Sequence, residues 1–157
     1  MNSPTPNAPP AERPIAHAEA SLERAFLFGD ERPFAQCHAS TLVETRDGRT
    51  VVAFFAGTHE GHPDVAIWTV EGRAAGPAST RAAARGPTVF GPARRALKVR
   101  DVAHWNPVLY RLEGKPEAGT ETLALQFKIG ERIRTWQTWI ARSFNSPSVR
   151  ARFVTMK

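Results

Sequence analysis

The chain has 157 residues, 41% of them hydrophobic, which is enough for one globular domain with a buried core. Its formal net charge is +6, but the arginines are scattered and no run of about five basic residues occurs, which argues against nucleic acid as a partner. The single cysteine, Cys37, excludes an internal disulfide. No segment has the composition of a signal peptide or of a membrane span, so we expect a cytoplasmic protein with no membrane partner.

The start of the chain is rich in proline. Residues 1–14 hold five of the 13 prolines, with small and polar residues between them. Such a composition cannot bury a core, and it predicts a flexible leader over residues 1–24. At the end of this region residues 16–24 could form two helical turns. The apolar run that follows, at residues 25–28, favours a strand.

From His38 onward, apolar and polar residues alternate with the period of a β-strand. The segments ASTLVE and TVVAFFAG flank a turn at Asp47-Gly48, which predicts a hairpin. DVAIWTVEG alternates again, and a long connection rich in alanine, glycine and proline leads to ARRALKV. These segments predict four antiparallel strands.

A second block of strands follows at a similar spacing. PVLYRLEG, ETLALQFKIG and TWQTWIARS alternate in the same way and predict three strands, with a turn at KPEAGT after the first. The similarity of the two blocks indicates an internal repeat. Residues 144–157 break the rhythm, and we expect a solvated tail there.

Connections in an antiparallel meander alternate between the two ends of the sheet. The start of the first strand therefore shares an end with every second connection after it. Polar residues gather at that end, and the opposite end receives ordinary turn residues. The gathered residues are His38, His59, Glu60, His62, Asp64, His104, Trp105, Asn106, Glu131, Arg132, Arg134 and Trp136.

These segments resemble the sialidase-like BNR-repeat family, whose fold is a six-bladed β-propeller of four-stranded blades. The resemblance is carried by CHASTLVETRDGRTVVAFFAGTHEGHPDVAIW, HWNPVLYRLEG and LALQFKIGERIRTWQTWIARS, between Phe34 and Ser143. It implies an all-β fold with about two antiparallel blades of an incomplete propeller over residues 25–143. The family's Ser-x-Asp-x-Gly-x-x-Trp box should begin at Ser143 but is absent, so residues 144–157 are expected to be unmatched. We therefore expect an amino-terminal fragment that lacks the parent's other blades.

The resemblance also implies roles for individual residues. Glu60 takes the place of the catalytic acid/base, and Asp64 is the next candidate. His38 stands where sialidases carry the first arginine of Arg-Ile-Pro, and Trp105-Asn106 matches a segment that lines the pocket in relatives. The remaining candidates for substrate binding are His59, His62 and Arg132.

Each of these roles has a simpler alternative. Glu60 could be a solvated loop residue, His38 could bond a neighbouring loop, and Arg132 could simply be exposed. A zinc site built from Cys37, His38, His59 and His62 is disfavoured by their spacing, so we expect neither a metal nor another cofactor. Trp68, Trp136 and Trp139 are expected in strands as core residues.

The family implies a glycoside hydrolase of sialidase type that acts on a terminal, acidic or neutral sugar of a glycan. The alternative is a non-catalytic module that binds carbohydrate or protein, which the loss of Arg-Ile-Pro favours. In either case we expect this chain by itself to be inactive as a hydrolase. We also expect it to expose strand faces and therefore to associate.

Overall fold

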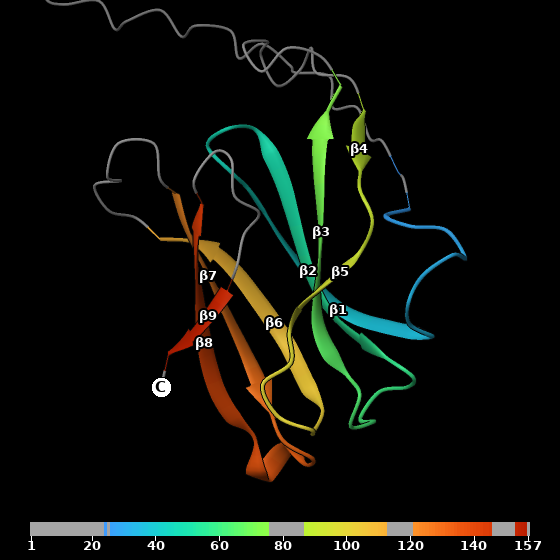
Figure 1. Cartoon of the computed structure of the whole chain (residues 1–157), viewed down its shortest axis with the longest axis vertical. Helices are drawn as coiled ribbons and strands as arrows, with labels where there is room; N and C mark the ends of the chain where they lie inside the picture. Colours follow the sequence, from blue (N-terminus) through green and yellow to red (C-terminus); the bar gives the residue numbers. More distant parts are fainter. Residues whose placement is uncertain (1–23, 25, 76–86, 113–120, 146–152, 157) are drawn as a thin grey trace, which may run out of the picture.

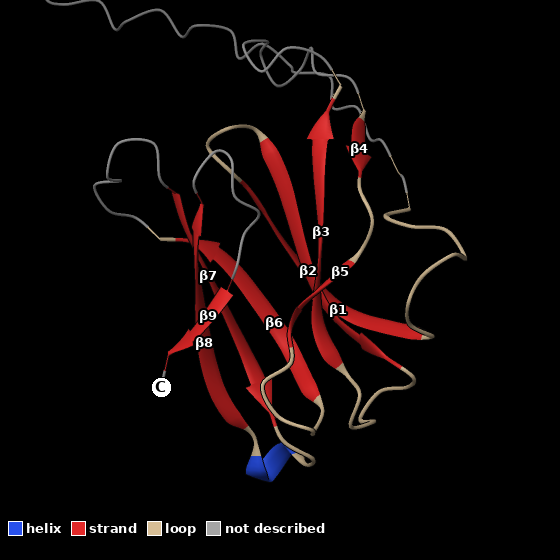
Figure 2. Ribbon diagram, in the orientation of Figure 1, coloured by secondary structure: helices blue, strands red, loops and turns tan. Residues whose placement is uncertain are grey.

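The computed structural model describes residues 24, 26–75, 87–112, 121–145 and 153–156, and the leader predicted over residues 1–24 lies almost wholly outside them (Figure 1). The described part contains no α-helix and consists of two antiparallel sheets, so the all-β prediction is confirmed (Figure 2). One sheet has the order β1-β2-β3-β4, with β5 also paired to β3, and the other has the order β6-β7-β8-β9. The elements are β1 Gln36–Glu44, β2 Arg49–Gly57, β3 Ala66–Ala74, β4 Thr88–Phe90, β5 Arg94–Leu97, β6 His104–Arg111, β7 Glu121–Ile129, the 3-10 turn η2 Ile133–Thr135, β8 Gln137–Asn145 and β9 Phe153–Met156.

The predicted hairpin is formed by β1 and β2. Gly48 has a φ of 77°, the left-handed conformation that a tight turn requires and that glycine adopts without strain. The hydroxyl of Thr45 donates to Asp47 Oδ1 and accepts from the N–H of Arg49 at 3.0 Å, so this turn is closed by side-chain bonds as well as by the strands.

The outer edge of the first sheet differs from the expectation of one strand. Two short strands share the edge of β3: β4 pairs with residues 72–74, and β5 pairs with residues 67–69. Gly91 and Pro92 lie between them. Proline has no N–H for a ladder and glycine weakens a strand, which accounts for the break.

The second sheet extends further than the sequence pattern predicted. β8 continues to Asn145, and β9 pairs with it from Ser143↔Phe153 to Ile140↔Met156. The expected end of the sheet at Ser143 therefore differs from the structure. β9 has only four residues and no turn signal before it, so the sequence shows too little alternation to predict a strand. Its position depends on pairing with the free edge of β8.

The main core lies between the two sheets. Alternate residues of β2 and β7 face each other across it, because successive side chains of a strand point to opposite faces. Three large side chains in this core, Phe55, Leu125 and Phe127, are at most 2% exposed. Burying each of them contributes about 1.5–3 kcal/mol, and this apolar contact holds the sheets together.

The other face of the first sheet is covered by residues 26–35. Phe28 and Phe34 pack on Phe54, with ring centroids 5.6 and 5.5 Å away, and Phe34 also contacts Trp68 at 5.2 Å. Residues 26–28 were predicted to form a strand, and this prediction is wrong for them. Leu27 and Phe28 cover a sheet face without pairing to an edge, whereas Phe26 is 96% exposed. An apolar run does not show whether it will pair with an edge or cover a face.

The first strand of each sheet carries the same irregularity. β1 has a bulge between His38 and Thr41, with Ala39 at φ 51°, and β6 has one between Trp105 and Val108, with Asn106 at φ 42°. A bulge bends its strand and re-aims the side chains beside it. The two blocks of strands that were predicted to be a repeat therefore also share this backbone irregularity in their first strands.

The end of the sheets that was expected to hold ordinary turn residues contains an ionic network. Arg49 bonds both Asp47, at 2.9 Å, and Glu71, at 3.0 Å, and Arg73 reaches Asp47 at 3.2 Å. Burial raises the pKa of Asp47, but bonds from Thr45 and Arg49 and the charges of the two arginines outweigh it and lower the pKa. The sequence pattern missed this network because its members lie on three different segments.

Candidate functional site

Four segments meet at one end of the two sheets: the start of β1, the β2–β3 loop, the start of β6 and the β7–β8 connection (Figure 1). We call residues 36–38, 58–64, 104–106 and 130–136 the loop end. The pairings Gln36↔Gly57 and His104↔Ile129 fix each strand start beside the loop that follows the neighbouring strand. The structure thus places all the sequence-predicted site residues at the loop end.

Glu60 lies in the β2–β3 loop and is exposed. Its backbone N–H donates to Gln36 Oε1 at 3.3 Å, so the loop is tied to the residue that begins β1. His38 lies two residues after Gln36 in β1, and its partner in the β1–β2 ladder is Phe55. Glu60 and His38 therefore share one end of the molecule, and the Glu60 carboxylate makes no hydrogen bond with a described residue.

Asp64 closes the same loop. Its carboxylate accepts from the Thr58 hydroxyl at 2.6 Å, from the Thr58 N–H at 3.1 Å, and contacts His62 Nδ1 at 2.8 Å. Burial raises the pKa of Asp64, but the bonds from Thr58 and His62 outweigh it and lower the pKa to about 2. At neutral pH this side chain is an ionised brace for the loop and carries no proton to donate.

The two loop histidines lie against each other. The rings of His59 and His62 are 5.0 Å apart at their centroids, and both side chains are accessible to solvent. His59 Nδ1 contacts the backbone oxygen of Glu60 at 3.0 Å, and His62 Nδ1 contacts Asp64. These contacts order the loop on both sides of Glu60.

His38 and Asn106 occupy the bulges at the two strand starts. His38 stacks on Phe55 with centroids 5.5 Å apart and is exposed, and Asn106 is exposed as well. The bulges expose these two polar side chains at the same end of neighbouring sheets, where hydroxyl or carboxylate groups of a ligand could bond them.

Trp105 connects the loops of the two sheets. Its ring lies 5.7 Å from Phe55 and 5.1 Å from Trp136, and an atom at the Cβ position of Gly61 would be 3.4 Å from it. Its indole N–H donates to the Gly130 carbonyl at 2.7 Å. Trp105 is therefore half-buried and packs between the loops, and only part of its ring is available to a ligand.

The β7–β8 connection carries Arg132, Arg134 and Trp136. Both arginines are exposed, and the backbone carbonyl of Arg132 accepts from Thr135. Trp136 was expected inside a strand, but it follows η2 and precedes β8. Its indole nitrogen is buried and has no hydrogen-bond partner among the described residues.

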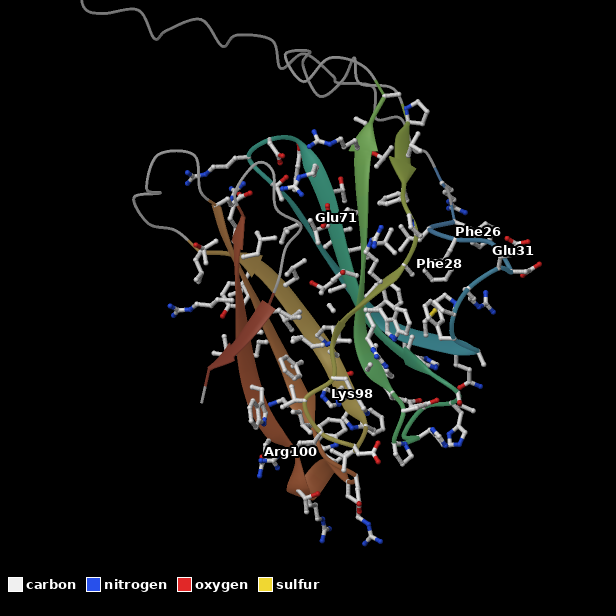
Figure 3. All side chains as sticks on the ribbon, in the orientation of Figure 1. Phe26, Phe28, Glu31, Glu71, Lys98 and Arg100 are labelled. Atoms are coloured by element: carbon white, nitrogen blue, oxygen red, sulfur yellow. The ribbon has the colours of Figure 1, made fainter. Side chains whose placement is uncertain are left out.

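One residue that holds the loop end, Lys98, was not singled out from the sequence. The ammonium of Lys98 donates to three backbone carbonyls, those of Pro63, Val65 and Val102. Burial lowers the pKa of Lys98, and the charge of Arg95 acts in the same direction. Figure 3 shows Lys98 at this end, between β5 and β6. A lysine beside a strand gives no sequence signal for such a role.

His104 is fully buried beside Lys98. Its Nδ1 donates to the Val102 carbonyl at 2.8 Å, and its Nε2 accepts from the Val99 N–H at 2.9 Å, which fixes a neutral ring. Burial lowers the pKa of His104 to about 4, and the positive charge of Lys98 adds to this, although the bond to Val102 opposes it. This histidine supports the loop end from within.

The match to a family model covers residues 48–155, more than half of the chain, and the model describes a BNR repeat-like domain. The chain belongs to the BNR repeat-like domain family. The match includes β9, so the BNR repeat-like domain extends past the expected boundary at Ser143. No curated protein and no solved structure matches the chain.

In this BNR repeat-like domain, the described residues contain no group of three His, Cys, Asp or Glu side chains arranged to hold a metal ion. Cys37 and His38 lie on opposite faces of β1, because Cys37 packs with the Phe54 face and His38 with Phe55. Over the same part of the chain, no helix is long and apolar enough to cross a membrane. The loop end therefore offers hydrogen-bonding and charged side chains, chiefly His38, Glu60, Asn106 and Arg132.

Proposed function

We propose that the loop end binds the terminal sugar of a glycan, in the manner of a sialidase-like module. One observation carries the proposal: the β2–β3 loop is bonded to Gln36 of β1 and packed on Trp105 of β6. Polar residues from three distant segments therefore lie together at the loop end. Planar polar side chains bond sugar hydroxyls and aromatic faces stack on sugar rings, and this end supplies polar side chains and part of the Trp105 ring.

In this proposal His38 and Asn106 bond sugar hydroxyls, and Arg132 attracts an acidic substituent. The guanidinium of Arg132 is exposed and presents a planar set of donors suited to a carboxylate. The neighbouring sheets act as two blades of a sialidase-type propeller, and further blades would complete the sugar-binding site at the loop end.

Hydrolysis is the second candidate, because Glu60 is the one acid of the β2–β3 loop whose carboxylate is not bonded to a described residue. A general acid must hold a proton near neutral pH, which burial by a bound sugar would favour. Asp64 takes the role of the loop brace, since its low pKa keeps it ionised.

The test is binding of the full chain to immobilised terminal sugars, acidic and neutral, together with turnover of aryl glycosides. We expect saturable binding that His38→Ala and Asn106→Ala weaken about tenfold or more. The matched control for Glu60→Gln is Glu31→Gln, because Glu31 is exposed on the segment 26–35 (Figure 3). Turnover lost only in Glu60→Gln would establish hydrolysis, whereas binding unaffected by both alanine variants would refute the proposal.

A further inference from the structure

A groove lies on the opposite side of the first sheet from His38 and Trp105. It has a volume of about 400 Å³, and its lining includes Pro33, Phe34, Thr58, Asp64, Trp68 and Arg95. This volume is within the range of small-molecule sites. The walls come from the covering segment 26–35 and from β5, and the floor is the end of β2.

Among the residues that the structure describes, the groove contains one positive group, and that group makes no bond. Arg95 is exposed, and no hydrogen bond or ion pair joins it to any residue that the structure describes. It pairs with Trp68 across the β3–β5 ladder, which places both side chains on the groove side. Lys98 carries a second positive charge close enough for Arg95 to affect it.

Asp64, the one acid among the described residues that line the groove, does not neutralise this charge through contact. Asp64 already accepts bonds from the hydroxyl and the N–H of Thr58 and contacts His62, which occupies both of its oxygens. The indole N–H of Trp68 is also used, by the carbonyl of Ala56 at 3.1 Å. What remains for a ligand is a guanidinium beside an aromatic edge and a proline ring.

We propose that this groove binds small organic anions that carry an apolar body, such as aromatic carboxylates. The carboxylate pairs with the guanidinium of Arg95, whose planar fork suits two oxygens. The apolar body lies against Trp68 and Pro33 at the groove wall. The groove shares Thr58 and Asp64 with the β2–β3 loop, but it is separate from the residues proposed to bind the sugar. It opens on the face of β1–β3 that packs against residues 26–35, away from the second sheet.

The test is a titration of the ¹⁵N-labelled full chain with phenylacetate, followed through the four indole N–H signals. We expect a saturable shift of the Trp68 signal. Arg95→Gln should weaken binding about tenfold or more, because it removes a charge-assisted bond. The matched control is Arg94→Gln, which removes the same charge from the neighbouring residue, paired with Thr69 and hence on the opposite face. That variant should change the Kd less than about twofold.

Two further binding measurements test the proposal, one with a neutral analogue and one with a variant of the glycan site. The neutral analogue 2-phenylethanol should bind the wild-type chain at least about tenfold more weakly, and this comparison does not depend on the folding of any variant. Glu60→Gln should bind phenylacetate as the wild type does, which separates the groove from the glycan site. Equal weakening by Arg94→Gln and Arg95→Gln, equal binding of the neutral analogue, or no saturable shift of Trp68 would each overturn the proposal.

Discussion

The carboxylate of Asp64 lies directly over Gly57. A Cβ built on Gly57 would come 2.5 Å from Asp64 Oδ1 and 2.9 Å from Val65 Cα. The β2–β3 loop can close on the end of β2 only because residue 57 has no side chain. Gly57 and Asp64 therefore set the position of the loop that carries Glu60.

The first prediction concerns this contact. Gly57→Ala should destabilise the fold by about 1–3 kcal/mol, because the backbone of Val65 would have to move as well as the carboxylate. Urea unfolding measures the change in free energy. Gly29→Ala is the control, because a Cβ at Gly29 has nothing within 4 Å, and it should leave stability nearly unchanged. Equal effects of the two variants would contradict the steric argument.

The second prediction concerns His104. Its pKa is about 4 in the folded chain, below the ordinary value of 6.5, so the unfolded chain takes up a proton at a higher pH. Stability from the neutral ring is nearly complete above pH 6.5 and is lost as the pH falls towards 4, by about 3 kcal/mol. The free energy of unfolding, measured by urea at a series of pH values, should show this slope. In His104→Phe the slope over this range should be flatter, and an unchanged slope would assign it to other groups.

The third prediction concerns Lys98. Lys98→Met keeps the aliphatic stem but removes the donors to the carbonyls of Pro63, Val65 and Val102. We expect amide hydrogens of the loop, such as those of His62 and Val65, to exchange about tenfold faster, because their carbonyl anchors are lost. Exchange in β7 should not change, and mass spectrometry distinguishes the two regions. Uniformly faster exchange would mean global destabilisation instead of a local release.

The fourth prediction compares two tryptophans. Trp105→Phe removes the indole bond to the Gly130 carbonyl and should cost about 1–2 kcal/mol more than Trp136→Phe. The indole N–H of Trp136 is buried without a partner among the described residues, so its loss removes an unfavourable group. Thermal unfolding of both variants measures the difference. A more costly Trp136→Phe would show that its N–H has a partner.

The fifth prediction concerns the face of the second sheet that points away from the core. Val108 is 52% exposed and Ile140 is 36% exposed on it. We expect the isolated chain to associate, since burying these side chains is favourable, and Ile140→Lys should shift the sedimentation profile towards monomer. A wild-type chain that is monodisperse and monomeric would contradict this prediction.

Local patterns were sufficient for most of the fold. Alternation and the Asp47-Gly48 turn located β1, β2, β3, β6, β7 and β8, because side-chain period and turn chemistry are properties of short segments. They did not locate β4 or β9, which are too short to show a period and exist where β3 and β8 leave an edge open. They also assigned residues 26–28 to a strand, because an apolar run does not reveal whether it will pair with an edge or cover a face.

The sequence by itself determined that polar residues from distant segments share one end, because reversing strands must return the chain there. It could not determine what each residue does at that end. Asp64 was a candidate acid by sequence, and only the folded loop gives it Thr58 and His62 as partners. The ammonium of Lys98 and the backbone N–H of His104 both bond the Val65 carbonyl, and these groups come together only when the two sheets pack. Hydrogen bonds and burial between distant segments depend on distances that tertiary packing sets, whereas strand period and chain reversal are local.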